Sequence, residues 1–467
     1  MTAVDVVVMA AGKGTRMKSR TAKVLHRLGG RPLIAHVMDT AHALAARRTI
    51  VITGHGAEDV EGWLRSAAAA QGRPSPDFVR QEPQLGTGHA VQQAVPVLPD
   101  DGIALILNGD VPLIRPETLQ ALVDKCGGER LALLTVEMAD PTGYGRILRR
   151  GDAVQAIVEH KDASAAQRGI REVYTGFMAV PERKLKTWLA RLSNDNAQRE
   201  YYLTDIVQFA VADGCEVVAS PAAEQVEVDG VNSPLQLAAL ERAFQSRQAN
   251  ALMEQGVRLA DPARFDLRGR LSCGQDVEID VNCVFQGEVS LGDNVRIGPN
   301  CVISNAKIAA NVVLQAYTHI EGEEAGVEIG EGALIGPFAR LRPGAQLGPE
   351  VHIGNFVEVK NSTLARGAKA NHLAYLGDTT VGERVNYGAG SITANYDGAN
   401  KNRTVIEADV HVGSNCVLVA PVTVAKGGTI GAGSVVNKNT EPGALTVARA
   451  KQVSITNWQR PKKAAKK

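Results

Sequence analysis

Residues 279–303 read IDVNCVFQGEVSLGDNVRIGPNCVI, and an apolar side chain returns at every sixth position of this stretch. Neither a helix nor an alternating strand has a period of six. A parallel β-helix does, because each hexad forms one side of a coil and stacks its apolar residue on the coil below. The same step runs through much of the C-terminal half, at Ile279, Phe285, Leu291, Ile297, Ile303, Ile329, Ile335, Leu341, Leu347, Ile353, Val359, Val412, Leu418, Val424, Ile430 and Val436.

Small or medium side chains stand four residues after most of these hexad positions, and a glycine often follows the apolar residue directly. The small positions include Cys283, Val289, Val295, Cys301, Ala333, Ala339, Ala345 and Ser434. Cys283, Cys301 and Cys416 fall at this inward position, which predicts core packing for them. The six cysteines form no C-x-x-C pair, so neither a zinc site nor a disulfide framework is indicated.

The N-terminal part, to about residue 231, has a different pattern. Short apolar runs such as DVVVMA, RTIVITG and IALILNGD alternate with helical stretches such as RPLIAHVMDTAHALAARR. This alternation predicts an α/β, Rossmann-like domain with a doubly wound sheet of parallel strands. Ligands of such sheets bind beyond the carboxyl ends of the strands, where the loop at Gly12 and the residue Asp110 both fall.

The loop in VVVMAAGKGTRM, residues 6–17, fits neither familiar phosphate-binding template. A P-loop needs G-x-x-x-x-G-K-S/T and a dinucleotide fingerprint needs G-x-G-x-x-G. Here Gly12 and Gly14 are present, Lys13 lies between them, and Met17 occupies the third fingerprint position. The glycines still let backbone N–H groups approach a phosphate, and the nearby cations Arg16 and Lys23 favour a site for a triphosphate that is being cleaved.

Length, charge and punctuation divide the chain of 467 residues. Ser233, Pro234 and Gln236 are N-terminal helix signals and Gly256 is a stop signal, which predicts a linker helix. We therefore expect a first domain at 1–231, a linker helix at 232–256, a repeat domain at 257–450 and a basic tail at 451–467.

The balance of charge argues against some partners. The 51 basic and 50 acidic residues nearly cancel, so no global field points to nucleic acid or membrane. Only the tail RPKKAAKK is strongly basic, and we interpret it as a solvated end rather than a binding arm. No leader and no apolar run of about 18 residues occurs, which predicts a cytoplasmic protein without stable membrane insertion.

Motifs along nearly the whole chain carry a specific resemblance. The first half contains AAGKGTRM, TAKVLH, QEPQLGTGHA, NGDVPL, DPTGYGRI, IVEHKDA and VDGVN, and the second contains LRPGA, GNFVEVK, KANHLAYLGD, NYGAGSITANYDGANK and VAPVTV. Together they resemble the bacterial family of bifunctional N-acetylglucosamine-1-phosphate uridyltransferases and glucosamine-1-phosphate acetyltransferases. The resemblance implies a left-handed β-helix of hexapeptide repeats, a homotrimer, and acetyl-CoA and UTP as co-substrates. Glucosamine-1-phosphate would be acetylated, and N-acetylglucosamine-1-phosphate then coupled to UTP.

The uridyltransferase reaction joins two anions, so charge neutralisation and positioning should supply most of the catalysis. Arg16 and Lys23 would offset charge on the leaving pyrophosphate. Asp110 ends an apolar strand and is a hard ligand suited to Mg²⁺, and the resemblance makes Asn232 its partner on the metal. By resemblance, the nucleotide and sugar are held by Ala10, Ala11, Gly12, Lys23, Gln81, Gly86, Thr87, Asn108, Gly109, Asp110, Gly145, Glu159 and Asn232.

One position departs from the family. Where this sequence reads Tyr174, Thr175 and Gly176, the family has an asparagine in place of the tyrosine, and that asparagine contacts the sugar. We expect a neighbouring residue or the hydroxyl of Tyr174 to take over the contact.

The acetyltransferase site is expected where the hexad rhythm breaks, between about residues 363 and 411. His372 is the natural base, since its ordinary pKa lies near neutrality and the attacking amine must lose a proton. By resemblance Arg342, Lys360, Tyr375 and Asn386 bind the amino-sugar phosphate. Also by resemblance, acetyl-CoA contacts Ala389, Asn395, Tyr396, Ser414, Ala432 and Arg449. The non-hexad insertion after residue 392 could be only a solvated loop, but its position beside His372 favours an arm that covers the cofactor.

Two other interpretations stay open at the level of sequence. The β-helix could be an assembly and regulatory module, as hexapeptide domains of related pyrophosphorylases are. The set Lys360, His372, Tyr375 and Asn386 speaks against it, because a scaffold does not need those side chains. A nucleic-acid binder acting through the tail would lose function when residues 460–467 are removed, whereas we expect near-normal turnover.

Overall fold

The computed structural model describes residues 2–463, so Lys466 and Lys467 of the basic tail lie outside the described residues. The chain forms two compact units, and the division falls between Arg247 and Gln248, inside helix α9 (Pro234–Glu254). Within residues 2–463, no helix has the length and apolar character needed to cross a membrane.

The N-terminal unit is built on a nine-stranded sheet in the order β11-β7-β10-β6-β1-β4-β5, with β8 and β9 attached through β10. The strands are β1 (Val4–Met9), β4 (Arg48–Thr53), β5 (Asp77–Arg80), β6 (Ile103–Asn108), β7 (Leu131–Glu137), β8 (Gly145–Arg150), β9 (Ala153–Val158), β10 (Glu172–Pro181) and β11 (Val217–Pro221). The predicted strands at DVVVMA, RTIVITG and IALILNGD are confirmed as β1, β4 and β6. A small hairpin pairs β2 (Arg27–Leu28) with β3 (Arg31–Pro32).

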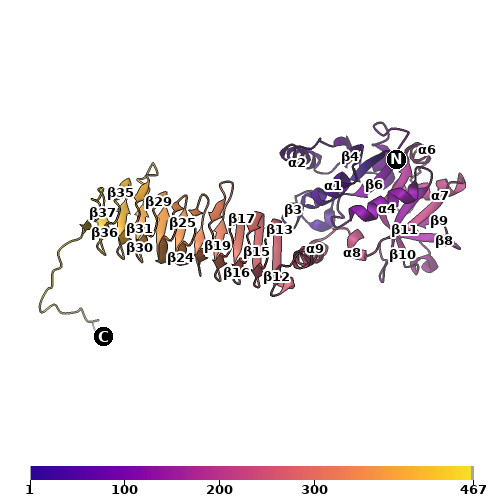
Figure 1. Cartoon of the computed structure of the whole chain (residues 1–467). Helices are drawn as coiled ribbons and strands as arrows, with labels where there is room; N and C mark the ends of the chain where they lie inside the picture. Colours follow the sequence, from indigo (N-terminus) through magenta and orange to yellow (C-terminus); the bar gives the residue numbers. More distant parts are fainter. Residues whose placement is uncertain (1, 464–467) are drawn as a thin grey trace. The chain divides into compact units, whose positions relative to one another are not determined.

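Helices cover both faces of this sheet (Figure 1). Val6 and Val8 of β1 belong to one buried core and Val7 to a second, because successive side chains of a strand point to opposite faces. This two-sided burial confirms the predicted α/β fold. The helices of the unit are α1 (Leu33–Ala43), α2 (Ala57–Ala70), α3 (Thr87–Gln92), α4 (Pro116–Cys126), α5 (Ala165–Arg168), α6 (Glu182–Leu189), α7 (Ile206–Ala212) and α8 (Gln225–Val228), with short 3₁₀ turns η1 (Thr15–Met17), η2 (Lys23–Leu25) and η3 (Leu203–Asp205).

The expected sheet of parallel strands has an exception at β10, and the attached β8–β9 hairpin is antiparallel as well. Strand β10 runs antiparallel to both β6 and β7, and its first residue, Glu172, pairs with the last residue of β7, Glu137. After β7 the intervening chain forms the β8–β9 hairpin, which pairs with the start of β10, and it re-enters at the same end of the sheet. A parallel neighbour would have required a crossover back to the opposite end, which this segment does not make.

The C-terminal unit is the parallel β-helix that the hexad period predicts, and Figure 1 shows its coils following one another from pink through orange to yellow. Ile279 pairs in parallel with Ile297, which is three hexads further along the chain. Every hexad residue named above is at most 4% exposed, and Cys283, Cys301 and Cys416 are at most 1% exposed. The repeat therefore packs as predicted, one apolar side chain from each face.

One face of the β-helix consists of β12 (Arg258–Leu259), β14 (Glu278–Ile279), β16 (Arg296–Ile297), β18 (Val313–Leu314), β21 (Leu334–Ile335), β24 (His352–Asn355), β27 (Lys369–His372), β30 (Asn386–Tyr387), β33 (His411–Val412), β36 (Thr429–Ile430) and β38 (Leu445–Thr446). A second consists of β19 (His319–Glu321), β22 (Arg340–Leu341), β25 (Glu358–Lys360), β28 (Tyr375–Gly377), β31 (Ile392–Ala394), β34 (Val417–Val419) and β37 (Val435–Val436). The third consists of β20 (Val327–Ile329), β23 (Gln346–Leu347), β26 (Thr363–Leu364), β29 (Thr379–Val381), β32 (Thr404–Ile406) and β35 (Val422–Val424). Strands β13 (Phe265–Cys273), β15 (Cys283–Leu291) and β17 (Val302–Ile308) pair at the start of the second and third faces, and the turn η4 (Pro262–Arg264) precedes β13.

One corner of the β-helix carries side chains that are unusual for its backbone conformation. Tyr317, Phe338, Phe356 and Leu373 all have positive φ angles, between 49° and 60°. Bulky residues are rare in this region and are strained there, and such strain concentrates at functional surfaces. Yet these four side chains are about half exposed, and the three aromatic rings stack on one another. We call them the aromatic corner.

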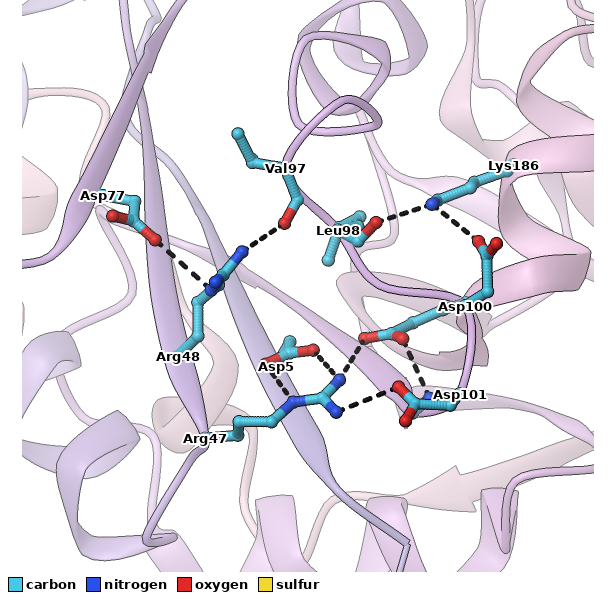
Figure 2. A network of polar contacts seen from close by, with 11 residues as sticks. Asp5, Arg47, Arg48, Asp77, Val97, Leu98, Asp100, Asp101 and Lys186 are labelled. Carbon is cyan, nitrogen blue, oxygen red and sulfur yellow. Dashed lines mark hydrogen bonds and ion pairs between the residues drawn. The ribbon is translucent and has the colours of Figure 1, made fainter.

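A buried acid pair lies at the amino-terminal end of the sheet in the N-terminal unit. Asp5 and Glu182 are both 0% exposed, and Arg47 forms an ion pair with Asp5 at 2.5 Å and lies 3.5 Å from Glu182. Figure 2 shows Arg47 directed at Asp5 and Asp101. Burial, and then the hydrogen bond to Asp5, raises the pKa of Glu182 from 4.5 to about 7. Between pH 4.5 and about 7, the folded protein therefore keeps a proton on Glu182 that the unfolded chain would release.

This proton makes the stability of the N-terminal unit depend on pH. Since the folded pKa is raised, the contribution of Glu182 is complete below pH 4.5 and is lost as the pH rises through about 7. In Glu182→Gln, the amide can donate to Asp5 and accept from the N–H of Gly102 without ionising. The loss of about 2 kcal/mol of unfolding free energy between pH 5 and pH 8 should therefore disappear. Urea unfolding followed by tryptophan fluorescence at both pH values measures it. The exposed control Glu137→Gln should keep the wild-type slope, and an unchanged slope in Glu182→Gln would contradict the assignment.

Candidate active sites

The first cluster of predicted site residues lies at the carboxyl ends of β1 and β6. Lys23, in η2, donates to Asp110 Oδ2 at 2.6 Å and to Asn232 Oδ1 at 3.2 Å. Gly14 faces Lys23 directly: its φ is +59°, and a Cβ there would lie 2.8 Å from the Cβ of Lys23. Only glycine suits both the conformation and the space. The loop glycine therefore positions the lysine, and the lysine links residues that are far apart in sequence.

Asp110 and Asn232 are held by backbone contacts. Asp110 lies two residues after the end of β6, and its carbonyl accepts from Val231 N–H at 2.9 Å. Ser233 Oγ accepts from Gln236 N–H, as the predicted helix start requires, and Gln236 Oε1 accepts from the N–H of Asn232. The start of α9 thus fixes the backbone that presents Asn232 to Lys23.

The predicted nucleotide residues gather around the loop between β5 and α3. Gln81 is 3% exposed and donates to the carbonyl of Gly86 at 2.8 Å. Gly86 has a φ of +107°, and a Cβ there would lie 2.7 Å from the carbonyl oxygen of Tyr201. Thr87 Oγ1 accepts from Leu203 N–H. Ala10 and Ala11 are buried after β1, while Gly12 is exposed, with nothing within 4 Å of a Cβ placed there.

Two predicted sugar residues, Gly145 at the start of β8 and Glu159 just after β9, lie near Tyr174 of β10, whereas Asn232 lies with Lys23. A Cβ on Gly145 would come within 3.6 Å of Glu159, which accepts from Thr204 Oγ1 at 2.9 Å. Burial raises the pKa of Glu159. Tyr174 is 8% exposed, burial raises its pKa, and its hydroxyl has no partner within residues 2–463. A Cβ on Gly176 would run into the side chain of Asn108, and Gly109 N–H donates to the carbonyl of Met9.

Arg16 lies on the exposed turn η1, and no ion pair of its own ties it to the cluster within the described part of the chain. Burial, and then the charges of Asp229 and Asp110, raise the pKa of Tyr144. The positive charge of Arg16 acts on the same hydroxyl in the opposite direction. Sequence reasoning did not single out Tyr144, Asp229 or Thr204. The first two stand inside the motifs DPTGYGRI and VDGVN, which is the signal that could have found them.

The second cluster centres on His372 at the end of β27. His372 Nδ1 lies 2.9 Å from Asn355 Oδ1, and the two residues are register partners on β27 and β24. A cavity of about 440 Å³ lies beside them and is lined by His352, Phe338 and Phe356 among others. Asn355 was not predicted, although it stands in the motif GNFVEVK. An asparagine oxygen at Nδ1 accepts the ring proton, which leaves Nε2 free to take another.

Cationic side chains gather on the next face. Arg342 pairs with Glu358 at 2.9 Å, and Glu358 is the register partner of Tyr375. Lys360 lies beside Lys401, and this second ammonium lowers the pKa of Lys360. Lys401 comes from the non-hexad insertion and was missed, since only the fold brings it back to Lys360. Such a group of cations suits a phosphate.

The predicted acetyl-CoA residues stack along the corner that carries His372. Asn386 pairs with His411, and His411 pairs with Thr429. Three residues after these come Ala389, Ser414 and Ala432, which therefore lie on successive coils above His372. The Arg449 guanidinium donates to the carbonyl of Ala432 at 2.5 Å. Asn386 itself pairs with Lys369 rather than with His372.

The insertion is an ordered loop. Tyr396 and Lys401 form an antiparallel bridge, and Asn395 donates to Asp378 at 2.5 Å. Backbone N–H groups of Asn400 and Ala399 lower the pKa of Asp397 to about 2. The Tyr396 side chain is 63% exposed.

Comparison with known families agrees with this division of the chain. A MobA-like NTP transferase domain matches residues 6–180. Bacterial transferase hexapeptide repeats match residues 272–305 and 326–361, and a hexapeptide repeat of succinyl-transferase matches residues 403–438. The C-terminal unit is thus a left-handed parallel β-helix of hexapeptide repeats.

Full-length relatives are similar to the whole chain. The bifunctional protein GlmU of Polaromonas sp. (strain JS666) is 70% identical over 477 aligned positions, which cover 100% of this chain and 99% of the relative. The protein of the same name from Albidiferax ferrireducens is 69% identical, covering 98% and 100%, and that from Nitrosospira multiformis is 55% identical, covering 100% and 99%. With both halves and both clusters present at this identity, the chain belongs to the family of the bifunctional protein GlmU.

Proposed function

We propose that residues 1–231 transfer the uridylyl group and residues 257–450 transfer the acetyl group in this bifunctional enzyme, with residues 232–256 as the linker helix. Glucosamine-1-phosphate is acetylated by acetyl-CoA, and N-acetylglucosamine-1-phosphate is then coupled to UTP, giving UDP-N-acetylglucosamine and pyrophosphate. The supporting observation is that full-length similarity to bifunctional relatives coincides with two polar clusters, one in each unit. UDP-N-acetylglucosamine serves cell-wall synthesis, and we place the enzyme in the cytoplasm.

In uridylyl transfer, a phosphate oxygen of the sugar attacks the α-phosphorus of UTP and pyrophosphate leaves. Backbone N–H groups around Gly12 and Gly14 would bind the phosphates, and Lys23 and Arg16 would neutralise the charge that develops on the leaving group. Uridine would lie against Ala10, Ala11, Gln81, Gly86 and Thr87. The sugar would lie against Asn108, Gly109, Gly145, Glu159 and Asn232.

The residues present fit a magnesium ion. Asp110 Oδ2 and Asn232 Oδ1 both converge on the ammonium of Lys23, so two hard oxygen donors already face one cationic position. Within residues 2–463, no group of three or more His, Cys, Asp or Glu side chains could hold a metal, so an all-protein cage is not present. Mg²⁺ typically uses one or two protein oxygens and takes the rest from waters and substrate phosphates. When bound, it would supply charge neutralisation at the phosphates.

In acetyl transfer, His372 Nε2 takes the proton from the amine as nitrogen attacks the thioester carbonyl, and coenzyme A leaves as the thiol. Asn355 keeps the imidazole in the tautomer that can accept at Nε2. Arg342 and Lys360, joined by Lys401, would bind the sugar phosphate, while Tyr375 and Asn386 would contact the sugar. Acetyl-CoA would follow the corner formed by Ala389, Ser414 and Ala432 toward Arg449, with Asn395 and Tyr396 covering it.

Two assays on the purified full-length chain test this division. Release of free coenzyme A thiol from acetyl-CoA and glucosamine-1-phosphate measures the first reaction. Release of pyrophosphate from UTP and N-acetylglucosamine-1-phosphate, with and without Mg²⁺, measures the second. If the β-helix were only an assembly or regulatory module, pyrophosphate release would occur without any thiol release.

Tyr174 provides a sharper test of the sugar site. Its buried hydroxyl lacks a partner within residues 2–463, so we expect it to hydrogen-bond the sugar phosphate substrate. Tyr174→Phe should raise the KM for N-acetylglucosamine-1-phosphate about fivefold, with the KM for UTP unchanged. Tyr387→Phe is the matched control and should leave the KM for N-acetylglucosamine-1-phosphate unchanged. The buried hydroxyl of Tyr387 also lacks a partner within residues 2–463, but it lies in the acetyltransferase unit. An unchanged sugar KM in both Tyr174→Phe and Tyr174→Ala would contradict the expectation.

The aromatic corner supports a homotrimer. Tyr317, Phe338 and Phe356 are about half exposed on strained backbone, and Phe338 and Phe356 line the same cavity as His372. Covering them with another copy would bury large apolar side chains and place a neighbouring chain beside the base. Phe356→Asp should convert a sedimenting trimer to monomer and reduce thiol release at least tenfold, while pyrophosphate release persists. A wild-type monomer, or a Phe356→Asp trimer with full activity, would contradict this assembly.

A further inference from the structure

The N-terminal unit contains a cavity that neither proposed reaction uses. It has a volume of about 560 Å³ and lies between α1 and α2, at the amino-terminal ends of β4 and β5. Strands β1 and β4 are parallel, so the cavity lies at the amino-terminal ends of the strands, whereas the Gly12 loop lies at their carboxyl ends. Its size falls within the range of small-molecule sites, roughly 300–1,000 Å³.

The cavity exists because two helices face each other with small side chains. Ala35 of α1 and Ala67 and Ala68 of α2 line it, together with the larger apolar groups of Met38 and Trp63. Ala69, the next residue of α2, does not line it and is exposed. Alanine leaves space that leucine or phenylalanine would fill, and Trp63 offers a flat apolar face at the side of that space.

Four arginines stand around the cavity, and two of them are already engaged. Figure 2 shows Arg47 directed at Asp5 and Asp101, and Arg48 between Asp77 and the carbonyl of Val97. Because these two guanidinium groups already form ion pairs and hydrogen bonds within the protein, they have few N–H donors left to bind a ligand.

The other two arginines, Arg31 and Arg73, share a single acidic partner. Arg31 Nη2 contacts Asp39 Oδ2 at 2.6 Å, and Arg73 Nη1 contacts Asp39 Oδ1 at 2.8 Å. Two cations therefore share one carboxylate, which leaves one positive charge uncompensated. Their side chains are 41% and 37% exposed, so each guanidinium still reaches solvent. A second anion placed between them would complete the pairing with charge-assisted hydrogen bonds.

We propose that this cavity is a binding site for a small aromatic anion, with the ring against Trp63 and Met38 and the sulfonate, carboxylate or phosphate at Arg31 and Arg73. Apolar walls with a few polar groups at one end are the usual composition of a ligand site. The site is independent of the two reactions, since none of its lining residues belongs to either polar cluster.

The probe is 8-anilinonaphthalene-1-sulfonate, titrated into the full-length protein and followed by energy transfer from tryptophan. Saturable binding is expected in the wild type. Arg73→Met leaves Asp39 paired with Arg31 and should weaken binding about tenfold, because it removes one charge-assisted contact. Ala68→Phe fills the cavity and should remove the saturable phase, whereas the control Ala69→Phe should bind as the wild type does.

Probe bound at the aromatic corner would respond to none of these substitutions, which separates the two surfaces. If Ala68→Phe does not fold, as judged by circular dichroism, Arg73→Met decides alone. Wild-type affinity in Arg73→Met, or in folded Ala68→Phe, overturns the proposal. Thiol and pyrophosphate release by the same preparations report on the two reactions separately, so failure here leaves the proposed function standing.

Discussion

His372→Ala should slow thiol release from acetyl-CoA and glucosamine-1-phosphate by about 10²–10⁴-fold, the usual contribution of a general base. Within the described residues the His372 ring hydrogen-bonds only to Asn355, whose neutral amide cannot replace the imidazole as the base for the amine. Pyrophosphate release by the same variant should stay within twofold of wild type, because the uridyltransferase cluster lies in the other unit.

His352 is the matched control for this variant. It lies on the preceding coil and lines the same cavity, but no proposed step uses it. His352→Ala should therefore keep thiol release within about twofold. Full thiol release from His372→Ala, or equal losses in both variants, would remove His372 as the base.

Asn355 tests the tautomer separately from the base. In Asn355→Asp, a carboxylate facing Nδ1 favours the imidazolium form of the ring over the neutral form that acts as the base. The acidic limb of the pH profile of thiol release should move to higher pH, an effect that a merely structural role would not produce. Asn355→Ala should lower kcat about tenfold, but it should not move the acidic limb of the pH profile to higher pH.

Asp110→Asn should reduce pyrophosphate release by about 10³-fold and leave thiol release unchanged. The substitution removes the only carboxylate of the two proposed magnesium ligands and leaves the Lys23 ammonium, 2.6 Å away, without its ion pair. Losing one preorganised charge in such a site commonly costs about 10²–10³-fold, and weaker metal binding adds to it.

Magnesium dependence distinguishes a ligand from a residue that only holds Lys23. In Asp110→Asn, the Mg²⁺ concentration for half-maximal activity should rise at least tenfold. Lys23→Met should lose turnover without that rise. Asp124→Asn, an exposed substitution on α4, is the control and should match wild type. Unchanged magnesium dependence in Asp110→Asn would remove Asp110 from the metal site.

Several features were predictable because they are local. Each hexad places one apolar side chain inward, so the period alone specifies a β-helix whose named positions are at most 4% exposed. The starts of β1, β4 and β6 and the first turn of α9 likewise follow from short apolar runs and capping residues.

Other features could not be predicted because they depend on how distant segments meet. The direction of β10 follows from the β8–β9 hairpin, which returns the chain to the end of the sheet where β7 stops, and no residue of β10 itself specifies that return. Lys401 was missed because its insertion must fold back before it reaches Lys360. Tyr144 was missed because its proximity to Arg16 and Asp110 exists only in the folded unit.

The sequence by itself determined the two architectures, the family motifs and the chemical groups available at His372, Lys23 and Asp110. Periodicity and residue type are properties of the sequence and do not depend on how distant segments pack. Only the tertiary structure decided which groups share a site. Lys23 of turn η2 meets Asn232 of the loop before α9, and His372 meets Asn355 through the register of two strands. These contacts depend on long-range pairing, which burial of apolar faces selects and local sequence does not specify.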